Sequence, residues 1–224
     1  MKINVIINLK KILFLFLLIF PNKLYASFFE DLTSQIVENP KRLSYGVSVT
    51  DVNKDGNFDF VVTGFGYLNL ALSYKDGKLI NIINENIFSD EFRRTIGVAA
   101  CDIDKDGYEE IYFLNTDTYS GTKKYSDRLI DFDGNKFLDL FEVEKNKKDL
   151  NLTAGRSVAC VDRKGDGTYG VYVANYGGPT RFYEYSDDVI VDKSVQLNLA
   201  KVTGGRAVVA CLLYTSPSPR DHWR

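Results

Sequence analysis

The stretch that decides the fold runs from Tyr45 to Asp59 and reads YGVSVTDVNKDGNFD. Small and β-branched residues lead into a loop of Asp, Asn and Gly, and a second apolar run follows. The same order returns from Ile96 to Glu110 (IGVAACDIDKDGYEE) and, in a weaker form, from Arg156 to Gly170 (RSVACVDRKGDGTYG). Recurrence at this spacing indicates an architecture built from one repeated supersecondary unit.

Each unit has room for four short strands. In the first unit we expect them at about 45–50, 58–63, 68–74 and 79–83, and Asp76-Gly77 between the last two is a strong hairpin signal. Four antiparallel strands per unit are typical of a β-propeller blade. The sequence therefore predicts an all-β propeller fragment over residues 27–210, of about three blades. The blades start near residues 45, 96 and 156, and a fourth opens near 205. The small residues of each first strand fit the crowded centre of a propeller.

The acidic loops have the spacing of a calcium site. Calcium takes six to eight oxygen ligands, and alternate positions of a tight loop can turn their oxygens inward. In the first loop we expect ligands from Asp51, Asn53, Asp55 and Asp59, with Asn57 giving its carbonyl. The second loop repeats the set with these residues: Asp102, Asp104, Asp106, Glu110 and the carbonyl of Tyr108. A metal-free acidic turn is the alternative for each loop.

The third loop has lost two of the expected ligands. Lys164 stands at the third position and Gly170 at the last, so that Asp162 and Asp166 remain. We expect no metal there, and the Lys164 ammonium is a candidate to stand in for the cation.

The two ends of the chain differ from the repeats. Residues 1–26 have a lysine-containing start, the apolar run Ile12–Phe20 and a small-residue cleavage site, which is typical of a secretory signal. Residues 211–224 resemble a translated sequencing adapter and are interpreted as an artefact tail, with a genuine Pro/Ser-rich linker as the alternative. The only His and the only Trp of the chain lie in this tail, so neither supports a function.

Between these ends acidic residues outnumber basic ones, which argues against nucleic acid as a partner. Two cysteines remain there, Cys101 and Cys160; an exported chain allows a disulfide between them, and two separate buried thiols are the alternative. Asn151-Leu152-Thr153 is a glycosylation acceptor sequence if the host is eukaryotic. No segment after signal cleavage is apolar enough to predict a membrane span.

Two strings go beyond a fold class: residues 100–115 and residues 154–165. Together they resemble the cartilage acidic protein 1 family of FG-GAP repeat (VCBS, ASPIC-type) proteins, over about residues 28–210. The resemblance implies an integrin-α-like propeller, seven-bladed when complete, of which this chain is an N-terminal fragment. It also implies a secreted or matrix-associated protein that acts in binding or adhesion, with no established enzymatic activity.

The leading interpretation is a secreted interaction scaffold in which calcium is structural, with an extracellular protein or glycan as partner. If the host is bacterial, the location is the periplasm or outside. The alternative is a carbohydrate-binding propeller, for which these aromatic residues are candidates: Tyr67, Tyr176, Phe182, Tyr183 and Tyr185. An enzyme is a third hypothesis. Residues 27–210 contain no histidine, so only a carboxylate-based chemistry would be open to it.

Overall fold

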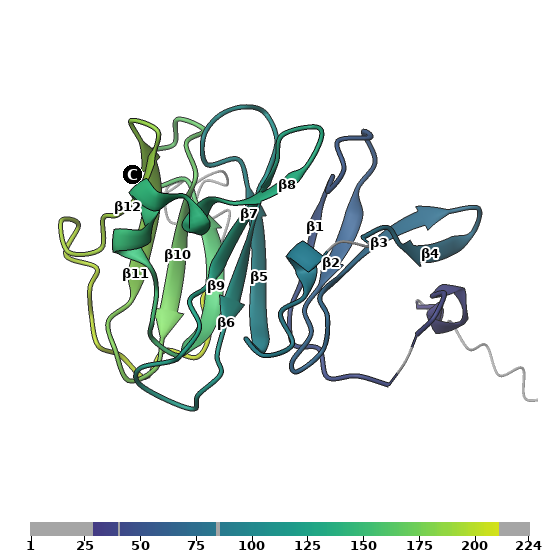
Figure 1. Ribbon diagram of the computed structural model, residues 1–224, viewed down its shortest axis with the longest axis horizontal. Helices are drawn as coiled ribbons and strands as arrows, with labels where there is room; N and C mark the ends of the chain where they lie inside the picture. The colour runs from purple at the N-terminus through teal and green to yellow at the C-terminus, as the bar shows by residue number, and fades with distance from the viewer. Residues whose placement is uncertain (1–28, 40, 84–85, 211–224) are drawn as a thin grey trace, which may run out of the picture. The chain divides into compact units, whose positions relative to one another are not determined.

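The computed structural model describes residues 29–39, 41–83 and 86–210. The expected signal segment and the artefact tail lie outside these residues. Within them the fold is all-β, with three four-stranded antiparallel sheets and four short 3-10 turns (Figure 1). No helix in this part of the chain is long and apolar enough to cross a membrane.

Each sheet is one sequence repeat, with its strands in chain order. The first contains β1 (Val47–Thr50), β2 (Asp59–Val62), β3 (Leu70–Lys75) and β4 (Lys78–Asn81). The second contains β5 (Thr95–Cys101), β6 (Glu110–Asn115), β7 (Arg128–Phe132) and β8 (Phe137–Asp139). The third contains β9 (Gly155–Val161), β10 (Gly170–Asn175), β11 (Arg181–Ser186) and β12 (Val189–Asp192). The predicted blade fold is therefore confirmed, and closure into seven blades stays a prediction.

The short 3-10 turns lie between the strands or before them: η1 (Thr33–Gln35), η2 (Asn86–Phe88), η3 (Leu140–Glu142) and η4 (Glu144–Asp149). The hairpin predicted at Asp76-Gly77 joins β3 to β4, and both residues have the positive φ angles (51° and 76°) that this turn requires. The expected fourth first-strand, over residues 205–210, is not a strand in the structure. In the three complete units the first strand pairs with a second strand that follows the loop, and the sequence after Ala210 contains no such loop.

The innermost strands β1, β5 and β9 lie side by side without pairing into one sheet. A Cβ atom added at Gly46 would lie 3.1 Å from the Cα atom of Gly97, and one at Gly97 would lie 3.3 Å from the Val158 side chain. These contacts explain why the first strand of each repeat is rich in small residues.

Two apolar cores separate the sheets. The core between the first and second sheets contains Val61, Phe88, Ile111 and Phe113. The core between the second and third contains Tyr112, Leu114, Val173 and Tyr183. Successive residues of β6 thus point into opposite cores, and all six of its residues are buried.

Candidate metal centre

The first acidic loop joins β1 to β2 and is curled by its own side chains. The Asp51 carboxylate accepts hydrogen bonds from the N–H groups of Asp55 (3.0 Å) and Gly56 (2.7 Å). Asp55 in turn accepts from the N–H of Asn57 (2.9 Å) and from the amide of Asn53 (3.1 Å). The φ of +84° at Gly56 is one that a Cβ atom would strain. The alternate positions of the loop are therefore held around one turn, as the spacing predicted.

The last residue of this loop is a buried carboxylate. Asp59 has no exposed surface, and its Oδ2 atom accepts from the N–H of Val52 (3.1 Å). Its Oδ1 atom is buried and has no hydrogen-bond partner. Burial raises the pKa of the Asp59 carboxyl, whereas the nearby Ser73 side chain and the N–H of Val52 lower it. A buried charged oxygen without a partner is costly, so this atom is suited to accept a cation or a proton.

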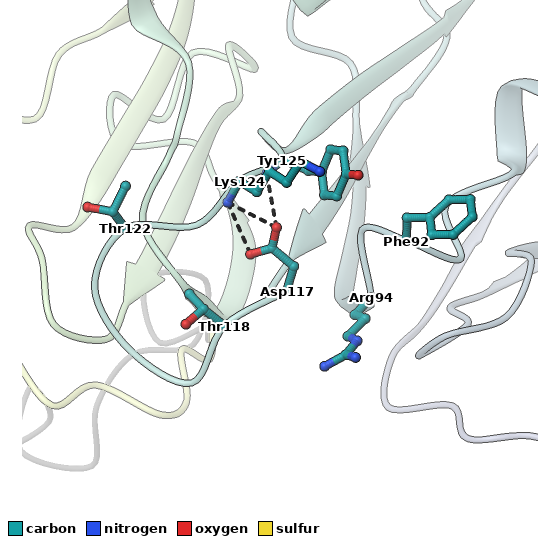
Figure 2. A pocket seen from close by; sticks show the side chains of 7 residues that line it. All are labelled: Phe92, Arg94, Asp117, Thr118, Thr122, Lys124 and Tyr125. Carbon is teal, nitrogen blue, oxygen red and sulfur yellow. Dashed lines mark hydrogen bonds between the residues drawn. The ribbon is translucent and has the colours of Figure 1, made fainter.

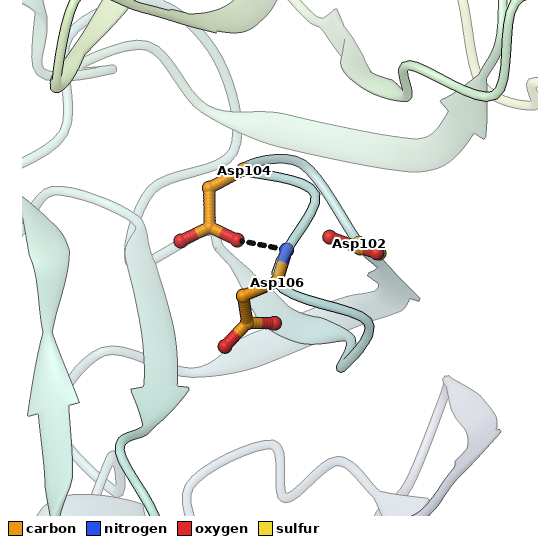
Figure 3. A group of neighbouring side chains, drawn as sticks. All are labelled: Asp102, Asp104 and Asp106. Carbon is orange, nitrogen blue, oxygen red and sulfur yellow. Dashed lines mark hydrogen bonds between the residues drawn. The ribbon is translucent and has the colours of Figure 1, made fainter.

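The second loop joins β5 to β6 and brings three carboxylates together. Oxygens of Asp102, Asp104 and Asp106 lie within 4.8 Å of one another (Figure 3). Asp102 accepts from the N–H groups of Lys105 (2.7 Å) and Gly107 (3.0 Å), and Asp104 accepts from that of Asp106 (3.1 Å). The sequence-predicted ligands at the first, third and fifth positions therefore converge in this loop.

Glu110 repeats the arrangement of Asp59. It is 1% exposed; its Oε2 atom accepts from the N–H of Ile103 (2.8 Å), and its Oε1 atom is buried without a partner. Burial raises the pKa of Glu110 to about 8, against the Ile103 hydrogen bond, and the charges of Asp104 and Asp131 raise it further. The first two copies of the repeat thus each end in a buried carboxylate oxygen without a hydrogen-bond partner.

The donor set fits a hard divalent cation. All of the side-chain candidates are carboxylate or amide oxygens, which calcium prefers, and each loop combines such oxygens with a buried oxygen in need of a partner. Asn57 and Tyr108 follow the loop glycines, and their N–H groups donate to Asp55 (2.9 Å) and Asp106 (2.8 Å). That their carbonyls are ligands stays a prediction.

The third loop is closed without the missing ligands. Asp162 accepts from the N–H groups of Gly165 and Gly167, both at 2.8 Å. At the last position, a Cβ atom on Gly170 would lie 2.7 Å from the Phe182 ring and 2.8 Å from the Tyr183 carbonyl oxygen. The third repeat therefore has no room for the acid that ends the other two loops.

An ion pair closes this loop against its sheet. Arg163 donates through Nε (2.6 Å) and a terminal nitrogen (3.1 Å) to the two carboxylate oxygens of Glu184 on β11. Two parallel hydrogen bonds of this kind are a strong form of the Arg–carboxylate pair. Arg163 thus ties the loop to β11, a contact that the sequence hid because Glu184 is distant along the chain, and the role of Lys164 stays a prediction.

A disulfide joins the first strands of the second and third sheets beside these loops. The structure links Cys101, directly before Asp102, to Cys160, two residues before Asp162, with the Cα atoms 6.1 Å apart. Of the two alternatives that the sequence left open, the structure therefore contains the bond.

The acceptor sequence at Asn151 is a correction. Asn151 has no exposed surface, and its side-chain nitrogen donates to Asp127 (2.6 Å) and Asn175 (3.0 Å). This network also contains the buried ion pair between Lys123 and Asp127. A glycan on this nitrogen would replace one of its two donated hydrogens and has no space at a fully buried side chain, so the folded chain does not offer Asn151 for glycosylation.

Most of the aromatic residues considered for sugar stacking are committed elsewhere. Phe182 and Tyr183 are buried in the sheet packing, and the hydroxyl of Tyr185 donates to Asp188 (3.2 Å). Tyr176 is half-buried beside two guanidinium groups and keeps part of its ring surface. Tyr67, at 44% exposure, is the one exposed residue among these five.

A basic and aromatic edge was not predicted from the sequence. It lies at the strand ends opposite the acidic loops. Arg156 stacks 5.3 Å from the rings of both Tyr119 and Tyr176, and Arg206 lies 5.6 Å from the Tyr176 ring. The repeated Gly-Arg pairs at residues 155–156 and 205–206 were the available signal.

A polar pocket of about 380 Å³ is lined in part by Thr118, the residue before Tyr119 (Figure 2). Its lining includes Arg94 and Lys124. The one carboxylate drawn there, Asp117, accepts from the N–H groups of Lys124 (3.0 Å) and Tyr125 (3.0 Å). We define the basic edge as Arg94, Lys124, Arg156 and Arg206 with the adjacent rings of Tyr119 and Tyr176.

Comparison with known proteins gives these features a family. The model of the FG-GAP-like repeat matches residues 51–113, which contain both candidate loops and the strands β2 to β5. Cartilage acidic protein 1 of Xenopus tropicalis is 43% identical over 194 residues, which cover 76% of this chain and 30% of that protein. The human protein of the same name is 42% identical over 205 residues, which cover 80% of this chain and 31% of that protein.

The mouse protein is 40% identical over the same length. The chain therefore spans about a third of the length of the curated relatives it matches. Over that span it is a homologue of cartilage acidic protein 1, built from FG-GAP-like repeats.

Proposed function

We propose that this chain is part of a secreted, calcium-stabilised interaction scaffold without enzymatic activity. The observation that carries the calcium part is the buried, unpartnered oxygen of Asp59 and of Glu110, each at the end of a loop of convergent oxygen donors. Calcium supplies positive charge to these oxygens when it is bound. Because each loop joins the first two strands of one sheet, its filling would hold those strands together.

The role is structural rather than catalytic. The first, third and fifth side chains of each loop would hold the ion, and the last acid would anchor it to the buried start of the second strand. Extracellular calcium modules bind at about 10⁻⁴–10⁻³ M. At a hundredfold excess over the dissociation constant, binding adds about 2.7 kcal/mol to the free energy of unfolding.

Calorimetric titration of the full-length protein with calcium tests this proposal. We expect Asp55→Ala and Asp106→Ala each to abolish one binding event, because each removes a ligand from one loop. Asp166→Ala, at the same position of the third loop, is the matched control and should leave both events unchanged. Binding that survives the first two substitutions together would contradict the assignment.

The secreted location is proposed from three features. These are the signal-like segment 1–26, the disulfide between Cys101 and Cys160, and the similarity to proteins named for cartilage. Disulfides persist mainly in oxidising compartments, and calcium at the required level is an extracellular condition.

The basic edge is the surface we propose for the partner. Its positive groups stand out in a chain whose net charge is negative, and Tyr119 is 70% exposed beside Arg156. A surface of guanidinium groups and rings favours an anionic partner. Among extracellular partners we favour a sulfated glycan, because an open edge of alternating charge and ring suits a chain of sugars and sulfates.

Retention of the full-length protein on immobilised heparin tests the edge. We expect the double variant Lys124→Ser, Arg206→Ser to elute at clearly lower salt, because two positively charged side chains that would pair with sulfate groups are lost. Lys145→Ser, Lys148→Ser, on η4, is the charge-matched control and should elute as the unchanged protein does. Equal elution of both variants, or preference for an acidic peptide column over heparin, would contradict the glycan assignment.

A further inference from the structure

A lysine of the first acidic loop reaches the second. The Nζ atom of Lys54 lies 3.5 Å from the Oδ2 atom of Asp106 and 3.8 Å from the centroid of the Tyr108 ring. Its side chain is only 14% exposed, against 43% for that of Asp106. The ammonium therefore lies between a carboxylate and an aromatic face, both of which attract it.

The backbone of the first loop sets the origin of this side chain. Lys54 has a φ of +58°, in the left-handed region. The residues after it are held by hydrogen bonds from Asp55 and Gly56 to Asp51. The lysine thus projects from between two candidate ligands of one loop and ends on a candidate ligand of the next.

The two loops differ in charge in the direction that Lys54 corrects. At the candidate ligand positions the first loop has three acids and Asn53, whereas the second has four acids: Asp102, Asp104, Asp106 and Glu110. Glu109 adds a fifth acid to the second loop. Lys54 adds one positive charge to the more acidic loop. Lys105 occupies the same position of the second loop with a φ of +67°.

We infer that Lys54 is an affinity-determining residue of the second calcium loop, and that it lowers this loop's affinity for calcium while stabilising the calcium-free form. The inference rests on the calcium binding proposed above. The positive charge of Lys54 beside Asp106 repels an incoming calcium ion. It also competes with that ion for the Asp106 carboxylate, which is a candidate ligand. The same charge offsets the repulsion among four acids while the loop has no ion.

Removal of the Lys54 charge should therefore raise the calcium affinity of the second loop and lower the stability of the calcium-free protein. A lysine with a merely structural role would lower stability without raising calcium affinity. We expect Lys54→Met to raise the affinity of the second loop about tenfold, from the Coulomb repulsion at this range. The same substitution should lower the melting temperature in a calcium chelator. Lys54→Arg keeps the charge and should stay near the unchanged protein in both measurements.

Terbium luminescence excited through Tyr108 is measured in an Asp55→Ala background, because the Tyr108 ring also lies beside Lys54 of the first loop and this substitution removes a ligand from that loop. The full-length protein is titrated with terbium, and calcium is then used to displace it. Tyr108→Phe, which removes the donor, identifies the signal. Lys105→Met is the control at the same loop position, and it should give a clearly smaller gain in affinity than Lys54→Met.

The outcomes separate the inference from the proposed function. Terbium and calcium binding with equal affinity in the unchanged protein and in Lys54→Met would overturn the inference and leave calcium binding intact. An equal gain in Lys105→Met would also overturn it, because the effect would then be one of net charge. No binding in any variant would overturn the inference together with the calcium proposal.

Discussion

At the scale of single residues, the candidate centre depends on where two carboxylates are buried. Asp59 and Glu110 begin second strands that pack between or beside apolar cores, so their charge is taken out of water. Burial is the largest cause of the raised pKa in both. The residues at the first and fifth positions stay partly exposed. Each loop therefore combines solvated acids with one desolvated acid.

The pKa of Glu110 predicts how stability depends on pH without calcium. Its value of about 8 in the folded chain lies above the ordinary 4.5, so between these pH values the folded state binds more protons than the unfolded state. Stability should then fall as pH rises from about 5 to 8 in a chelator. Glu110→Gln, which cannot ionise, should weaken this fall, as measured by thermal unfolding of the full-length protein at several pH values.

Calcium should abolish this fall because it favours the ionised carboxylate and so lowers the pKa of Glu110 in the folded state. With saturating calcium, Glu110 is ionised in both the folded and the unfolded state between pH 5 and 8, and its contribution to stability should be nearly constant over that range. Asp166→Asn, in the third loop, is the control and should keep the pH dependence of the unchanged protein. A chelated protein whose stability rises between pH 5 and 8 would contradict the buried, protonated state of Glu110.

At the scale of elements, the burial of a strand follows how many of its faces are covered. The β4 strand alternates between exposed and half-buried residues although its sequence does not alternate, so that apolar Ile80 is exposed and polar Asn81 is half-buried. The β6 strand is buried throughout because the first and third sheets pack against its two faces. Its run of apolar residues is the typical signal of such a strand.

The three acidic loops keep the same turn with two different sets of contacts at their ends. The first two end in a buried acid that leaves an oxygen without a partner, whereas the third has Gly170 and the ion pair between Arg163 and Glu184. The Arg163 side chain is 35% exposed, so water screens the pair and its contribution to stability is modest. The third repeat therefore keeps the turn geometry without needing an ion.

At the scale of the whole molecule, the first sheet has a face that the described residues leave open. Val47, Val49 and Phe60 are 61%, 49% and 41% exposed. A groove of about 940 Å³ on this sheet is lined in part by Leu68, Leu70 and Ile80. The opposite face of the same sheet is buried in a core. Exposed apolar patches of this kind are uncommon on isolated soluble domains.

We expect the segment 27–210, expressed alone, to bind a hydrophobic dye and to aggregate. Burial against a neighbouring sheet would stabilise the fold by about 25 cal/mol for each Å² of apolar surface covered. The segment expressed alone lacks this stabilisation at each exposed apolar face. Val47→Thr with Val49→Thr should reduce dye fluorescence, since both side chains are exposed and the replacements have nearly the same shape. A monomeric segment with one cooperative melting transition and no dye binding would contradict the expectation that the exposed face causes aggregation.

The sequence by itself determined the repeat, the order of strands within each unit and the acids at alternate loop positions, because these depend on residues close along the chain. Only the tertiary structure decided which of those acids is buried, that Lys54 lies on Asp106, and that Glu184 meets Arg163. It also decided that Asn151 is inaccessible and that the two cysteines are joined. These contacts form between segments distant in the sequence, and their partners are chosen by how the sheets pack rather than by any local pattern.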